Sequence, residues 1–352
     1  MNTKLPTPRF LLPLLPVLLW VVSGCATPTR DLAPFTIVVL PDTQEYVDQR
    51  TAKARERLAA GVDRTQIFLD QTSWIRDTAS PLNTKFVVHE GDITQTDDPG
   101  EWARARDAMN VLDGVVPYCL CLGNHDMGCQ QNAGGGWASA KTRDSLFEMY
   151  FPRTKYAHEP WFGGSFDNTL TNAYYFFSAA GMDFLILSLE FKPRNEVLEW
   201  AGGVLAEHPE RRSILLTHSY LYSEKDDSKR IGGNGYDVEG NHGEAMWQKV
   251  VRKHANVFLV LCGHVLGEGR RVSTGDHGNP VHEVLCDYQG LENGGNGWLR
   301  YMTFHPAEDK IEVYTYSPTL DELKEQPSSR FSLEYKMLGT VESIARVRPS
   351  AR

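Results

Sequence analysis

Five short polar motifs, each placed directly after a hydrophobic run, carry the residue types that bind divalent metals. The candidate side chains are Asp42, Asp92, Asn124, His218 and His264. Carboxylate, amide oxygen and imidazole together suit Mn, Fe, Zn or a related divalent ion better than calcium or a metal selected by thiolates. A lone aspartate or histidine at the end of a strand is more often a turn former. Only the ordered set therefore indicates a metal site.

The hydrophobic runs before the first three motifs have the composition of buried strands. Residues 35–40, 85–89 and 115–122 alternate with helical patterns at about 51–78 and 101–112. This βαβαβ order predicts parallel neighbouring strands joined by right-handed crossovers. Because the carboxyl ends of parallel strands open onto one crevice, we expect the motifs that follow them to lie together.

The second half of the chain predicts a hairpin over 173–190 that turns at Ala180–Gly181, followed by alternating helices and strands. The predicted helices are 195–207 and 244–254, and the predicted strands are 213–217, 257–261, 281–286, 298–304 and 310–316. Three long Gly-rich segments are predicted as loops, 127–140, 224–243 and 263–280. Loops of this length inside a compact domain are often functional.

Taken in order, the motifs resemble the signature of the calcineurin-like metallophosphoesterase superfamily, D-x-H … G-D … G-N-H-[DE] … H … G-H-x-H. The chain has Asp42-Thr43-Gln44, Gly91-Asp92, Gly123-Asn124-His125-Asp126, His218 and Gly263-His264 at the corresponding places. The resemblance implies an α/β fold, a metallophosphoesterase β-sandwich flanked by helices in four α/β/β/α layers. It also implies two metal ions bridged by one aspartate.

The resemblance further implies a role for each matched residue. Asp92 corresponds to the bridging aspartate, while Asn124, His218 and His264 complete the second metal site. Asp42 contributes to the first metal site. His125 corresponds to the catalytic histidine that assists the leaving group or steadies the phosphoryl oxygens. Asp126 is expected to orient neighbouring groups rather than to bind metal.

The chain departs from the signature at two positions of the first metal site. Gln44 replaces the histidine of D-x-H, and Leu266 replaces the second histidine of G-H-x-H. A glutamine oxygen is a weaker ligand than imidazole for a transition metal, and leucine offers none. We therefore predict Gln44 as a first-site ligand, with one tightly bound ion and a second, weaker one. His242 or Asp287 could replace a missing ligand.

The departures do not look random. The text Pro-Asp-Thr-Gln, together with Gly-His-Val-Leu-Gly and a later Gly-Gly-Asn-Gly-Trp-Leu-Arg, resembles a secreted bacterial subgroup of the superfamily.

His89, inside a predicted strand, is interpreted as structural. Several aromatic residues in or beside the Gly-rich segments could stack on a substrate or simply pack, namely Trp137, Trp161, Phe162, Tyr236 and Trp298.

The N-terminus predicts export. Lys4 and Arg9 precede an apolar run that is short for a membrane span, as in a signal peptide. Residues 22–25 resemble a lipobox, which implies a lipid anchor on Cys25. We predict a lipoprotein signal peptide over 1–24, a tether over 25–34, a metallophosphoesterase domain over 35–320 and a C-terminal extension over 321–352. The predicted location is the bacterial cell envelope, at the outer membrane or facing the periplasm.

Charge narrows the range of partners. The formal charge is −9, and loss of the two bases in residues 1–24 makes it −11. A negative chain does not attract polyphosphate backbones over long range, so no nucleic acid is expected as the partner. Nothing in the sequence indicates an oligomeric state. Five cysteines besides Cys25 leave at least one thiol free.

The sequence thus predicts metal-dependent hydrolysis of a phosphate ester, a phosphodiester or a small organic phosphomonoester, by a metal-activated water. One alternative keeps a single tight ion and a second that is recruited by Asp42 or by substrate. Another is a weak or inactive metal-containing module that binds phosphorylated ligands at the cell envelope. Loss of two histidines favours that module, whereas retention of Asp42, Asp92 and His125 opposes it.

Overall fold

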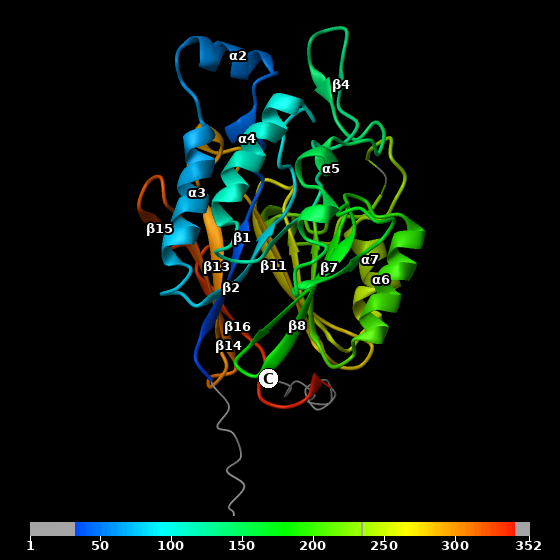
Figure 1. The fold of residues 1–352 in the computed structure, drawn as a ribbon. Helices are drawn as coiled ribbons and strands as arrows, with labels where there is room; N and C mark the ends of the chain where they lie inside the picture. Colours follow the sequence, from blue (N-terminus) through cyan, green and yellow to red (C-terminus); the bar gives the residue numbers. More distant parts are fainter. Residues whose placement is uncertain (1–31, 234, 342–352) are drawn as a thin grey trace, which may run out of the picture. The chain divides into compact units, whose positions relative to one another are not determined.

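Two seven-stranded β-sheets form the centre of the protein in the computed structural model, which describes residues 32–233 and 235–341 (Figure 1). The predicted signal peptide, Cys25 and most of the predicted tether lie outside the described residues, as do residues 342–352.

The first sheet contains the strands that precede the first three motifs. Its strand order is β15-β14-β13-β1-β2-β3, with β16 paired to β14. The strands are β1 (Phe35–Leu40), β2 (Thr84–His89), β3 (Tyr118–Leu120), β13 (Leu299–His305), β14 (Lys310–Ser317), β15 (Glu322–Lys324) and β16 (Phe331–Glu334). β1 pairs with β2, and β2 with β3, in parallel, which confirms the βαβαβ prediction. The last two strands come from the segment predicted as a C-terminal extension.

The second sheet contains the strands that precede the two histidine motifs. Its order is β11-β12-β10-β9-β8-β7-β6. The strands are β6 (Phe162–Ser165), β7 (Ala173–Ala179), β8 (Met182–Leu189), β9 (Arg212–Thr217), β10 (Val257–Cys262), β11 (Gly267–Thr274) and β12 (Pro280–Asp287). β8, β9, β10 and β12 run parallel to one another. β7 and β8 form the predicted hairpin.

Helices cover the outer faces of both sheets, which gives the predicted α/β/β/α layers (Figure 1). The helices are α1 (Gln44–Val47), α2 (Ala52–Ala59), α3 (Thr65–Thr78), α4 (Pro99–Met109), α5 (Phe147–Tyr150), α6 (Asn195–Glu207) and α7 (Gly243–Lys249). Short 3-10 helices span Asn110–Leu112, Arg153–Lys155, Glu224–Asp226, Val251–Lys253 and Glu292–Gly294. None of the helices in the described part of the chain is long and apolar enough to span a membrane.

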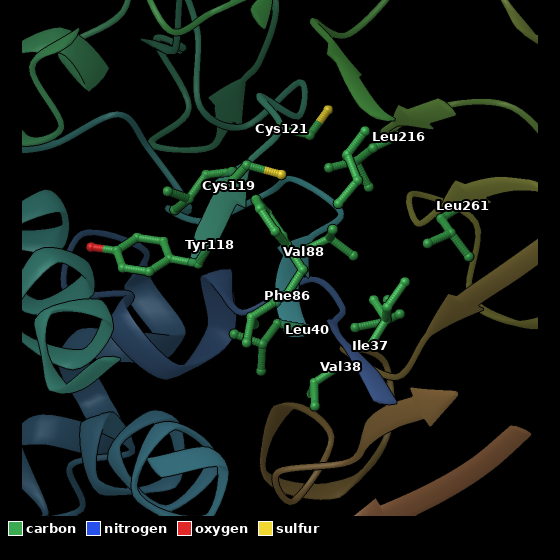
Figure 2. Close-up of a cluster of buried hydrophobic side chains, with 14 of the residues drawn as sticks. Ile37, Val38, Leu40, Phe86, Val88, Tyr118, Cys119, Cys121, Leu216 and Leu261 are labelled. Carbon is green, nitrogen blue, oxygen red and sulfur yellow. The ribbon is translucent and has the colours of Figure 1, made fainter. Parts of the chain in front are cut away.

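The core lies between the two sheets. Phe35 of β1 contacts the rings of Phe177 and Phe184 in the second sheet, at 6.4 and 5.5 Å between centroids. Figure 2 shows Ile37 of β1 and Val88 of β2 within the same cluster of buried side chains. The alternate residues of β1 face the helices, so the whole strand is buried. Burial on both faces explains why its sequence is a continuous apolar run.

A second core joins α6 and α7 to the outer face of the second sheet. α6 presents Val197, Leu198, Ala201, Val204 and Leu205 on one face. This 3.6-residue spacing made the helix predictable, and the observed bounds agree with the prediction.

Three predicted segments differ in detail. The helix predicted over 51–78 is two helices, because Gly61 adopts a φ of +78° and ends α2. The segment 127–140 contains a two-stranded hairpin, β4 (Gln130–Gln131) and β5 (Trp137–Ala138). The segment 263–280 contains β11, which is mostly polar and lies at an edge of the sheet. Its hydrogen-bonded ladder with β12, rather than an apolar face, defines it as a strand.

The described cysteines are free thiols. Cys119 and Cys121 are buried, as expected for the strand that contains them, and burial raises the pKa of both thiols. They are therefore inert core side chains.

Candidate metal centre

Residues from four of the five motifs meet in one buried cluster. His218, directly after β9, has its Nε2 3.2 Å from Oδ1 of Asp92 and 3.2 Å from Oδ1 of Asn124. His264, after β10, completes the cluster, since ligand atoms of Asp92, His218 and His264 all lie within 4.8 Å of one another. We call Asn124, His218 and His264 the histidine side of the site.

The orientation of His218 fits a cation between these atoms. Its Nδ1 is 2.8 Å from the carbonyl oxygen of Glu90, which can only accept, so Nδ1 carries the proton. In the neutral ring the lone pair of Nε2 then faces two oxygen acceptors, those of Asp92 and Asn124. Nε2 and the two oxygens are then all acceptors, and a metal ion bound among them would take their lone pairs. Asn124 is fixed in this orientation because its Nδ2 donates to Oγ of Ser139 at 2.9 Å.

The charge states of this cluster also suit metal binding. Burial and the neighbouring His218 lower the pKa of His264 to about 3, so its imidazole is neutral. Burial opposes the charged form of Asp92, yet attraction to His218 and His125 holds its pKa below the ordinary value. A neutral imidazole and an ionised carboxylate are the forms that coordinate metals.

The backbone brings these groups together through close approaches that only glycine permits. A Cβ atom at Gly123 would collide with the carboxylate of Asp92, and one at Gly263 would collide with that of Asp42. Asp92 and His264 themselves adopt φ angles of +48° and +75°, which are uncommon for residues with a side chain. Such conformations persist where the surroundings hold them in place, and they concentrate at functional sites.

Asp126 holds the loops of this site and is buried beneath them. Its carboxylate accepts hydrogen bonds from the backbone N–H groups of Gly123, Ile93 and Thr94, at 2.8, 3.1 and 2.7 Å. Burial, followed by repulsion from Asp92, raises its pKa to about 7. These contacts agree with the orienting role predicted for Asp126.

His125 lies at the partly exposed edge of the cluster. Its backbone N–H donates to Oδ1 of Asp92 at 2.9 Å, which ties it to the predicted bridge. Its Nδ1 is 2.8 Å from the carbonyl oxygen of Gln95 and therefore carries a proton. The other ring nitrogen, Nε2, is left to act on a bound molecule.

The predicted first metal site has a different composition. Asp42 is buried, and its carboxylate accepts the N–H of His264 at 3.3 Å and Nε2 of Gln289 at 3.1 Å. The same Nε2 of Gln289 donates to Oδ2 of Asp287 at 3.1 Å. Gln44 is also buried, and its Oε1 has no hydrogen-bond partner among the described residues. We call Asp42, Gln44, Asp287 and Gln289 the carboxylate side of the site.

Asp287 and Gln289 belong to this site although neither was among the predicted metal ligands. The sequence offers Asp287 as a possible replacement ligand, since it follows an apolar strand as Asp42 and Asp92 do. The position of Asp287 at the end of a strand is therefore the sequence signal that could have identified it as a ligand. Gln289 carries no sequence signal, because a glutamine two residues beyond a strand is ordinary. Leu266 is 55% exposed and offers only hydrocarbon.

Two other histidines near the site are committed to local hydrogen bonds. His89 accepts the N–H of Gly91 through Nδ1, and its Nε2 lies 2.9 Å from Oγ1 of Thr43, so the ring is structural as predicted. His242 uses Nδ1 to bond Ser219 at 2.9 Å, and burial together with Lys192 lowers its pKa to about 4.

One aromatic residue of the Gly-rich loops stands beside the metal ligands. The ring of Tyr236 lies 5.8 Å from that of His264 and 4.9 Å from that of Phe191. Trp161 instead packs on Tyr156 and Phe86, away from the metal ligands.

The sequence matches the family described as calcineurin-like phosphoesterase over residues 35–268. The match covers more than half of the chain, which belongs to the calcineurin-like phosphoesterase family. Proteins of this family use divalent metals.

The similar proteins match different fractions of this chain and of their own lengths. The chain is 32% identical over 306 residues to the uncharacterized protein YvnB of Bacillus subtilis (strain 168), covering 85% of this chain and 21% of YvnB. It is 26% identical over 220 residues to a probable cyclic nucleotide phosphodiesterase of Moraxella catarrhalis (strain BBH18), covering 59% of this chain and 65% of that protein. The chain thus spans about a fifth of YvnB and just under two thirds of the second relative.

Among solved structures, purple acid phosphatase PPD1 from yellow lupin (Lupinus luteus) is similar with a TM-score of 0.49 and 14% identity. The similarity covers 86% of this chain and 54% of that chain.

Proposed function

We propose that this protein hydrolyses a phosphate ester, either a phosphodiester or a small organic phosphomonoester, with divalent ions held by Asp42, Gln44, Asp92, Asn124, His218 and His264. The observation that carries the proposal is the orientation of His218 Nε2, Asp92 Oδ1 and Asn124 Oδ1 toward one another. The similarity to a probable cyclic nucleotide phosphodiesterase supports a diester as the first substrate to test.

The residues of the site have different roles in the proposed hydrolysis. Divalent ions such as Mn, Fe or Zn, when bound, polarise the phosphate and lower the pKa of a water. The histidine side holds one ion tightly, and the carboxylate side holds a second more weakly. His125, with its Nδ1–H fixed on the carbonyl of Gln95, presents Nε2 to the departing oxygen, and in the imidazolium form it would donate the Nε2 proton to that oxygen. Asp126 keeps the loops of Asp92 and Asn124 in register through its backbone hydrogen bonds.

The test is turnover of bis-p-nitrophenyl phosphate and of the monoester after loading with Mn, Zn or Fe. Asp92→Asn removes the central carboxylate, and Asp107→Asn is the matched control, because Asp107 is an exposed residue of α4. We expect diester turnover in the protein and in the control, and none in Asp92→Asn. Turnover that survives in Asp92→Asn would contradict the proposal.

A binding module without turnover is the second candidate, and the hydrocarbon side chain at Leu266 favours it. If the metal-loaded protein binds inorganic phosphate but hydrolyses neither ester with any of the three metals, this candidate replaces the first.

We also propose that the protein is exported and anchored through lipid on Cys25. The supporting pattern is a basic start, an apolar run and small residues before the cysteine. Mass spectrometry of the N-terminal peptide from membrane fractions should find a diacylglyceryl group on Cys25. A mature chain that begins after Cys25 would contradict the anchor.

A further inference from the structure

Asp287 lies where the metallophosphoesterase signature would place its missing histidine. In the antiparallel ladder between β11 and β12, Asp287 is paired with Gly267, the neighbour of Leu266. On the other side, β12 runs parallel to β10, with Leu285 paired to Cys262. The end of β12 therefore lies beside the turn of His264 and beside position 266.

The side-chain amide of Gln289 joins Asp287 to Asp42, a candidate ligand of the first metal site. Nε2 of Gln289 donates to one oxygen of each carboxylate, at 3.1 Å in both cases. Oδ2 of Asp42 and Oδ2 of Asp287 are therefore at most twice 3.1 Å apart. The backbone N–H of Gln289 also holds the other oxygen of Asp287, at 2.9 Å. These bonds fix the direction of both carboxylates.

The negative charge gathered here is balanced only in part, by His218 beside Asp92. Asp42, Glu90, Asp92 and Asp287 are each at most 2% exposed. Among the residues that the structure describes, no lysine or arginine forms an ion pair with Asp42 or Asp287. Buried carboxylates at this density are stable only when protonated or when a cation joins them.

A second, independent observation points to the same ion. Gln44 is 2% exposed, and its Oε1 has no hydrogen-bond partner in the described part of the chain. It lies two residues from Asp42, at the position where the signature has a histidine. A buried carbonyl oxygen without a donor is costly unless something else, such as a metal ion, takes its lone pair.

We propose that Asp287 is a ligand of the metal ion on the carboxylate side, which is the first metal site of the signature. It takes the coordination place that Leu266 leaves open, and Gln289 is the positioning residue. The ligands of this ion are then oxygens alone, from Asp42, Gln44, Asp92 and Asp287. Oxygen ligands suit harder ions such as Mn²⁺ or Mg²⁺, whereas the imidazoles of the histidine side suit Zn²⁺ or Fe²⁺. The two sides of the site therefore differ in the metal ion that they prefer.

This inference rests on the metal-dependent hydrolysis proposed above, but its test measures metal binding rather than turnover, so the two can fail separately. The protein is stripped of metal, equilibrated with Mn²⁺, and its metal content is measured by mass spectrometry. The variant is Asp287→Asn, and the matched control is Asp276→Asn on the β11–β12 turn, which is 42% exposed.

We expect two Mn²⁺ per chain in the protein and in Asp276→Asn, and one in Asp287→Asn, with the second ion bound at least about 10-fold more weakly. The electron paramagnetic resonance signal should change from a coupled pair to an isolated Mn²⁺. Two ions bound with unchanged affinity in Asp287→Asn would overturn the proposal. So would a single ion per chain in the unaltered protein.

Thermal unfolding separates ligation from a structural role and shows that the variant folds. Removing one of several repelling carboxylates should raise the melting temperature of Asp287→Asn in EDTA and reduce the further rise on adding Mn²⁺. An equal decrease with and without metal would contradict ligation. If Asp287→Asn does not fold, Leu266→His alone tests the same point, because an imidazole beside Asp287 should raise the Zn²⁺ affinity of the ion on the carboxylate side.

Discussion

The two sides of the metal site are made from different chemistry and from different parts of the chain. The histidine side carries two imidazoles and an amide, all at positions of the family signature. The carboxylate side carries two carboxylates and two amides, and Asp287 and Gln289 come from beyond the signature. Asp92 lies within hydrogen-bonding distance of His218 and acts electrostatically on Asp42.

The difference shows how one fold can change the metal preference of half a site. A histidine lost from one loop is compensated by a carboxylate at the end of the adjacent strand, because the sheet places the two positions side by side. The exchange adds negative charge, so the carboxylate side depends on a cation more strongly than the histidine side does.

The largest effect is expected where the two sides meet. Asp92→Asn should reduce diester turnover by well over about 100-fold, because loss even of an outer partner costs about 10–100-fold. Both ions should bind more weakly, as measured by metal content after dialysis. If Asp92→Asn weakened only one ion, Asp92 would belong to one side rather than to both.

Asp126→Asn should come next, with about 10–100-fold lower activity. An asparagine would turn an NH₂ group toward N–H donors that now meet a carboxylate oxygen. The free energy of unfolding should fall by about 1–3 kcal/mol in urea. Asp107→Asn serves as control, and equal stability of the two variants would contradict the orienting role.

Leu266→His should make the two sides more alike. The added imidazole should raise the affinity of the weaker site for Zn²⁺ by about 10-fold, equivalent to about 1.4 kcal/mol. Its affinity for Mn²⁺ should change less, since imidazole favours the softer ion. Competition titrations of the two metals measure the ratio of the Zn²⁺ affinity to the Mn²⁺ affinity at this site. An unchanged ratio would show that position 266 does not reach the ion of the carboxylate side.

Tyr236→Ala should have the smallest effect. The ring of Tyr236 lies beside His264 on the histidine side, so its removal should raise KM about 2–10-fold for aryl esters and leave kcat nearly unchanged. Steady-state kinetics with aryl and alkyl diesters make the measurement. A fall in kcat without a change in KM would place Tyr236 in the metal centre rather than in substrate binding.

Most of the fold could be predicted because its strands and helices have clear periodicity. β1 and β8 are nearly continuous apolar runs, and α6 has an apolar face at helical spacing. β11 escaped prediction because an edge strand needs no apolar face and is defined by its partner. The break between α2 and α3 depends on one glycine in a left-handed conformation.

The histidine side could be predicted because its residues occupy an ordered signature. The carboxylate side could be predicted only in part, because the sequence shows which ligands are lost but not which neighbours replace them. Asp287 follows a strand as many aspartates do, and its proximity to Asp42 depends on strand order in the folded sheet. Sequence spacing alone does not contain that information.

The most direct test of the account is a Mn²⁺ titration of the metal-stripped protein in which bound metal and bis-p-nitrophenyl phosphate turnover are measured together. We expect the ion of the histidine side to bind tightly with little turnover. Turnover should then rise as the weaker ion of the carboxylate side binds. Maximal turnover with one ion per chain would contradict the role of the carboxylate side. Two bound ions without any turnover would contradict the proposed hydrolysis itself.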